Sequence, residues 1–82
     1  MSRIRFSYIV QDCTAIQHPN ETPAEAVARS IQRRESGIHG VTMRLDSTAA
    51  NGSYAIYEAR LDGAADKSGA HLFRNVWVTI YR

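Results

Sequence analysis

The sequence has little cysteine, lysine or proline, and it has no long apolar run. It contains one cysteine, Cys13, two prolines and, among ten basic residues, a single lysine, Lys67. A lone cysteine excludes an internal disulfide framework and agrees with a reducing compartment. No run is long enough to span a bilayer, and the segment Met1–Arg5 lacks the apolar stretch of a signal peptide. We therefore expect a cytoplasmic protein that makes no membrane contact.

Reactive side chains are also sparse. Cys13 and His18 lie five residues apart, but no third group would orient the imidazole, so a packing role for Cys13 is the simpler interpretation. The histidines His18, His39 and His71 lack the paired spacing of a zinc site. No glycine-rich phosphate loop follows a predicted strand. These patterns predict a protein that is not an enzyme and that uses no metal and no cofactor.

The length of 82 residues fits one domain, spanning 1–82. A domain of this size buries only about 60% of the surface of its unfolded chain, which leaves little room for a deep cleft. The net charge of +2 is a mild excess and not the dense basicity of a dedicated nucleic-acid binder. Nine of the ten basic residues are arginine, which suits bidentate contact with carboxylates or phosphates. A GC-rich genome would produce the same bias.

A helix is predicted over 22–34. Thr22 is a suitable N-cap, Pro23 fits the first helical position and Glu25 completes a capping box. Two arginines occupy the last turn, where cations suit the helix dipole, and Gly37 can adopt the left-handed conformation that ends a helix. The apolar stripe expected to face a sheet consists of Ala24, Val27, Ala28 and Ile31.

Alternating apolar residues predict four strands, over about 3–10, 41–45, 53–61 and 72–81. Turn-forming residues predict loops over 11–21, 46–52 and 62–70, and Asn51-Gly52 indicates a hairpin between the second and third strands. Which side of the third strand is buried stays open. The predicted order is βαβββ, an α+β fold with a single helix packed on a four-stranded, mainly antiparallel sheet.

The arginines of the helix suggest a binding face. Arg29 and Arg33 are like charges four residues apart, which costs about 0.2 to 0.5 kcal/mol in an isolated helix. Glu25 precedes Arg29 by four residues, and the helix dipole favours cations near the end, so a structural explanation is adequate. The functional interpretation is a face for an acidic or phosphate-lined partner, formed by Arg29, Gln32, Arg33 and Arg34.

A second basic surface is expected on the sheet, formed by Arg3, Arg5, Arg44 and Arg60 if the first two predicted strands are neighbours. With Tyr54 and Trp77 exposed beside them, such arginines would form a platform for single-stranded RNA or DNA. Aromatic residues in strands are more often core or cross-strand pairs. The chain also lacks an RNP-type signature, so we rank this interpretation second.

One segment resembles a known family. The order of a helix end, then Ser36-Gly37-Ile38-His39-Gly40-Val41-Thr42-Met43-Arg44-Leu45, then a glycine-containing hairpin and Ser53-Tyr54-Ala55-Ile56-Tyr57, resembles small phage-encoded type I anti-CRISPR proteins. The most specific part runs from the helix end to His-Gly-Val-Thr-Met-Arg. Outside it, only the length and the element order match.

This resemblance implies a non-enzymatic phage inhibitor in the cytoplasm of a host bacterial cell. Such an inhibitor binds a type I CRISPR surveillance complex, along its Cas backbone subunits, and blocks target DNA. Arg29 and Arg34 match basic positions of that pattern, and Arg33 is an additional charge. Ser30 and Ser36 depart from it, where a basic residue and a glutamine are expected, and Ser36 lies within the contact region.

Three interpretations remain open at this point. They are a CRISPR inhibitor, a small basic regulator that binds nucleic acid directly, and a phage-type structural or toxin-antitoxin partner with neither activity. The sequence leaves the oligomeric state open between a monomer and a homodimer, because exposed strand edges can pair.

Overall fold

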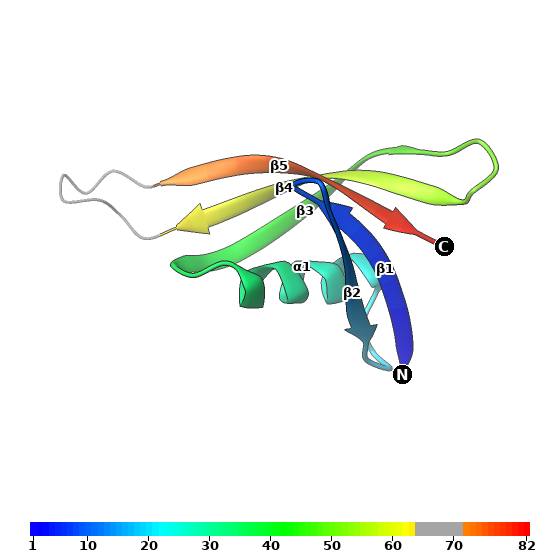
Figure 1. The fold of residues 1–82 in the computed structure, drawn as a ribbon, viewed down its shortest axis with the longest axis horizontal. Helices are drawn as coiled ribbons and strands as arrows, with labels where there is room; N and C mark the ends of the chain where they lie inside the picture. The colour runs from blue at the N-terminus through cyan, green and yellow to red at the C-terminus, as the bar shows by residue number, and fades with distance from the viewer. Residues whose placement is uncertain (64–71) are drawn as a thin grey trace.

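The computed structural model describes residues 1–63 and 72–82. In this part of the chain, one helix covers one side of a five-stranded sheet (Figure 1). The elements are β1 (Ser2–Tyr8), β2 (Gln11–Gln17), α1 (Pro23–Arg34), β3 (Ile38–Thr48), β4 (Tyr54–Gly63) and β5 (Phe73–Tyr81). The α+β class is confirmed. The four-stranded sheet and the order βαβββ are wrong, because the chain order is ββαβββ.

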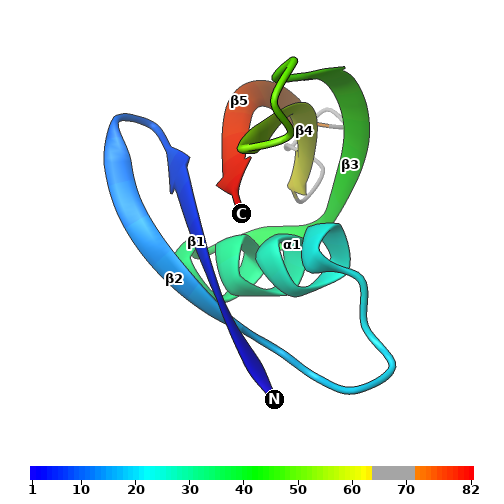
Figure 2. The same ribbon diagram turned by 90° about the vertical axis from the view of Figure 1, so that its right-hand side faces the viewer.

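The strands lie side by side in the order β2-β1-β5-β4-β3, and each neighbouring pair is antiparallel. The first and last strands of the chain are therefore neighbours in the sheet. They pair over a short stretch, in which Phe6, Ser7 and Tyr8 face Ile80, Thr79 and Val78. Figure 2 shows the sheet curling around α1, with β1 and β2 on one side of the helix and β3 on the other.

Strand β2 is the element that the sequence did not predict. Its inward residues Cys13 and Ala15 are small, and its outward residue Ile16 is partly exposed, so the alternation of apolar and polar residues is weak. The turn before it consists of Ile9 and Val10, which are not turn-forming residues. The first strand ends at Tyr8 and not at Val10, and the segment 11–21 is half strand and half loop.

Helix α1 begins as predicted. The Thr22 side chain accepts from the Glu25 N–H at 3.2 Å, and the Thr22 N–H donates to the Glu25 carboxylate at 2.9 Å. The cap at the other end is Glu35, whose N–H donates to the Ile31 carbonyl. Gly37 does adopt a left-handed φ of 79°, but in the turn that leads into β3.

The core lies between α1 and the inner side of the sheet. Its largest fully buried side chains are Phe6, Val27, Ile31, Leu61 and Val78. The buried stripe of the helix includes Ala26, which was not predicted, whereas Ala28 is only half-buried. The helix contacts β1, β2, β3 and β5, so the unpredicted strand β2 forms part of its cover.

The hairpin between β3 and β4 confirms the prediction from Asn51-Gly52. Gly52 has a φ of 74°, and its N–H donates to the Ala49 carbonyl. Of the loop predicted over 62–70, residues 64–70 lie outside the described residues, as does His71. The described chain contains no helix of the length and apolarity needed to cross a membrane.

Candidate functional site

The side of β4 and β5 that faces away from α1, called the outer face below, is open. Ala55, Ala59 and Leu61 of β4 are buried toward the helix, which answers the question that the sequence left open. On β5, Val78 and Ile80 are buried in the same direction. Tyr57 and Val76 also pack against the core. Because side chains alternate along a strand, the outward residues are Tyr54, Ile56, Glu58, Arg60 and Asp62 of β4 and Phe73, Asn75, Trp77, Thr79 and Tyr81 of β5.

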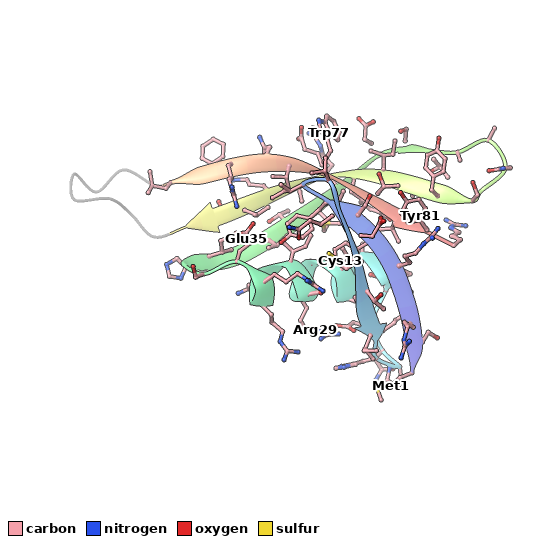
Figure 3. All side chains as sticks on the ribbon, in the orientation of Figure 1. Met1, Cys13, Arg29, Glu35, Trp77 and Tyr81 are labelled. Atoms are coloured by element: carbon pink, nitrogen blue, oxygen red, sulfur yellow. The ribbon has the colours of Figure 1, made fainter. Side chains whose placement is uncertain are left out.

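Three aromatic residues, Phe73, Trp77 and Tyr81, lie four positions apart on the outward side of β5. Trp77 is 58% exposed and Phe73 is 55% exposed, although large apolar side chains are usually covered. Figure 3 shows Trp77 projecting from the side of the sheet opposite the helix. Tyr54, the fourth outward aromatic residue, is paired with Tyr81 across β4 and β5.

Arginines from the neighbouring strands lie over two of these rings. The Arg60 guanidinium carbon is 4.2 Å from the centre of the Phe73 ring, and that of Arg5 is 4.4 Å from the centre of the Tyr81 ring. Both distances are in the range of cation–π attraction, which is worth about 0.5 to 1 kcal/mol at exposed sites. Trp77 lies between these two arginine–aromatic pairs along β5.

Two ion pairs border the same surface. Arg44 of β3 binds Glu58 at 2.9 Å, and Arg60 binds Asp62 at 2.9 Å. Glu58 is paired with Trp77 in the register of β4 and β5, and Arg44 is paired with Glu58 in the register of β3 and β4. The three residues therefore lie in one row across the strands. Exposed pairs of this kind contribute little to stability. They hold guanidinium groups in place on the outer face without burying them.

The four arginines expected as a second basic surface are all on outward positions, but the condition for that surface, that the first two predicted strands are neighbours, is not met. Strands β1 and β3 are not neighbours, because β5 and β4 lie between them. Arg5 therefore borders the aromatic row from one side, and Arg60 and Arg44 lie on the other. Arg3 is paired with Ile16 of β2, beyond the stretch where β1 meets β5. Arg3 and Arg5 take part in none of the ion pairs of the described residues.

Arg29, a central member of the predicted helix face, is engaged within the molecule. Its Nε and Nη2 donate to the two carboxylate oxygens of Glu21, each at 2.9 Å, and Nη2 also donates to the Ile16 carbonyl at 2.6 Å. This arrangement joins α1 to the end of β2. The hydrogen bonds from the Arg29 side chain and from the His18 N–H lower the pKa of Glu21 to about 2.

Of the other residues of the predicted helix face, one is bound within the molecule and three are exposed. Gln32 donates to the His39 carbonyl at 3.0 Å, so it links α1 to β3. Arg33, Arg34 and Ser36 are exposed, and no ion pair of the described residues includes either arginine. The predicted face therefore keeps two available cations, Arg33 and Arg34, at the end of the helix.

The described part of the chain contains no group of three or more metal-ligating side chains. Cys13 is buried in the core, which agrees with a packing role. Sequence reasoning missed Phe73 and Tyr81 as members of a surface with Trp77. The signal that would have found them is their spacing of four, because residues an even number of positions apart in a strand point to the same side of the sheet.

Comparisons with family models, with curated proteins and with solved structures found no match to this chain. The resemblance to anti-CRISPR proteins therefore stays a hypothesis.

Proposed function

We propose that this protein binds single-stranded nucleic acid on the outer face of the sheet. The observation that carries the proposal is the position of Trp77, an exposed indole between two arginine–aromatic pairs on an open sheet surface. Aromatic rings stack on bases, and arginines attract the phosphate backbone and also offer planar guanidinium groups for stacking.

The length of the aromatic row suits a short strand of nucleic acid. Consecutive residues of a strand are about 3.3 Å apart, so rings four positions apart are separated by about 13 Å and the whole row spans about 26 Å. A row of this length accommodates a segment of about four to six nucleotides, near the lower end of the known range for single-stranded binding sites.

The charges of the outer face predict weak to moderate affinity. Its outward arginines, two of which are paired with carboxylates, add only a small positive excess. Stacking on one base is worth about 1 to 3 kcal/mol. If Arg5, which lies over the row and belongs to no ion pair of the described residues, neutralises one phosphate, the slope of log K against log salt for a single strand is about −0.7. Stacking therefore supplies a larger share of the binding energy here than in a strongly basic protein.

The test is a titration of fluorescently labelled 12-nucleotide strands of DNA and RNA, followed by anisotropy. Trp77→Ala should weaken binding about tenfold, the effect of losing roughly 1.4 kcal/mol, while Trp77→Phe should retain most of the affinity. Arg5→Gln should weaken binding and flatten the salt slope, whereas Arg33→Gln, which removes the same charge from the helix, should do neither. Equal affinity for the wild type and Trp77→Ala would overturn the proposal.

The CRISPR-inhibitor hypothesis is a second candidate, and the exposed Arg33, Arg34 and Ser36 support it. Such a protein would retain a type I surveillance complex but bind no free nucleic acid. Arg33→Glu with Arg34→Glu should then abolish retention. Arg29 should be left unchanged in that experiment, because replacing it also breaks the contacts with Glu21 and Ile16.

A further inference from the structure

The turn between β1 and β2 has an unfavourable backbone conformation. Ile9 and Val10 form a two-residue connection between the paired residues Tyr8 and Gln11, and their φ values are 48° and 50°. Left-handed conformations are disfavoured for all residues with a Cβ and are rarest for β-branched ones. Hairpins of this length normally use Asn-Gly or a similar pair. Two adjacent β-branched residues are the least suitable choice for this turn.

Burial does not explain why these residues are present. Val10 is fully exposed and Ile9 is 46% exposed, so neither contributes much to the core. Strained residues persist where the surrounding structure holds them in place, and they are concentrated at functional sites. The turn therefore presents two stiff, branched, apolar side chains to whatever approaches the molecule from outside.

The turn is close to the proposed binding surface. The register of β1 and β5 pairs Tyr8 with Val78, which makes Ile9 and Trp77 the next positions along the two chains. The turn thus begins at the edge of the sheet next to the strand position of Trp77, and Ile9 also lines a hollow with Arg34 and Glu35 of the helix end. The residue after Gln11 is Asp12, and no basic residue lies between Arg5 and Arg29 in the sequence. In space, however, the hollow brings the two charged residues of the helix end beside Ile9. The apolar part of a contact at the turn therefore comes from the side chains of Ile9 and Val10 themselves.

We propose that Ile9 and Val10 act as an apolar wedge that separates two neighbouring bases of a strand bound at Trp77. This inference rests on the proposed function. Apolar side chains that enter between bases are a common device of nucleic-acid-binding proteins, and the bases must first unstack. Neighbouring bases that stack weakly on each other are separated at a lower cost in free energy. The preferred ligand class is therefore a flexible, pyrimidine-rich single strand rather than a stacked purine strand.

The test uses Ile9→Asn with Val10→Gly, called the turn variant, which places a favourable pair in the same turn. Because this change removes strain, the variant is expected to fold. Binding is measured on 12-nucleotide strands of deoxythymidine and deoxyadenosine at several salt concentrations. The wild type should prefer deoxythymidine by about fivefold, a modest preference set by stacking strength. The turn variant should bind both strands within about twofold of each other, with an unchanged salt slope.

The outcomes separate the two proposals. If the wild type binds neither strand, the proposed function fails and the wedge fails with it. If the wild type binds but the turn variant keeps the same preference, the wedge is overturned and the proposed function stands. If the turn variant instead loses self-association in sedimentation experiments and keeps its preference, the turn is a contact between copies of this chain, which also overturns the wedge.

Discussion

Arg29 shows how one residue can suit two explanations until its partners are known. In the sequence it belongs to an exposed row of helix arginines. In the structure its guanidinium binds Glu21 through two hydrogen bonds and also reaches the Ile16 carbonyl. Glu21 lies eight residues before Arg29, in the loop that leads to the helix, so helical spacing could not have predicted this pair. The positive charge at this point serves the fold.

This pair predicts a pH-dependent contribution to stability. The pKa of Glu21 is lowered from 4.5 to about 2, so the ionised carboxylate favours the folded state. The stabilisation is complete above the unfolded pKa and is lost as the pH falls from about 4.5 toward about 2. Thermal unfolding of the wild type and of Glu21→Gln should therefore differ at pH 7 and at pH 5, and the difference should shrink between pH 4.5 and pH 2.

Arg33→Gln is the matched control, because Arg33 lies on the same helix but belongs to no ion pair of the described residues. Its unfolding should show no such change with pH relative to the wild type. A difference between wild type and Glu21→Gln that stays constant down to pH 2 would contradict the assigned role of the pair.

At the scale of elements, the sequence predicts best where local chemistry decides the structure. The capping box of Thr22 and Glu25 and the glycine turn at Gly52 are local features, and the structure has both. Strand β2 was not predicted because its position is not decided locally. It depends on pairing with β1 and on covering the helix. The alternation from Cys13 to Ile16 is too weak to identify a strand without that context.

The β1–β2 turn gives a stability prediction at this scale. Each left-handed residue other than glycine costs about 1 to 2 kcal/mol of stability, and the turn variant removes this cost. Part of the gain in stability is offset, because replacing Ile9 removes its half-buried contacts. The turn variant should therefore be more stable than the wild type by about 1 to 2 kcal/mol, or roughly 4 to 16 °C in a small domain. Urea unfolding measures this directly, with the denaturant slope unchanged. A variant that is less stable than the wild type would show that the turn is not strained.

At the scale of the whole molecule, the sheet order determines which residues can act together. The aromatic row belongs to β5, the central strand, and its arginine neighbours come from β1 and β4. Arg5 and Tyr81 are near opposite ends of the sequence. The alternation of residues in the first strand predicted Arg5 on a sheet surface, but only the pairing of β1 with β5 brings it to Tyr81. The composition of the outer face could be predicted in part, and its layout could not.

The most direct test of the account is a nuclear magnetic resonance titration of the isotope-labelled protein with an unlabelled 12-nucleotide deoxythymidine strand. Trp77 is the single tryptophan, so its indole N–H gives one assignable signal from the centre of the outer face. We predict saturable shifts of this signal and of amides in β1, β4 and β5, with the amides of Arg33 and Arg34 unchanged. An unmoved indole signal, or shifts centred on the end of α1, would contradict the account.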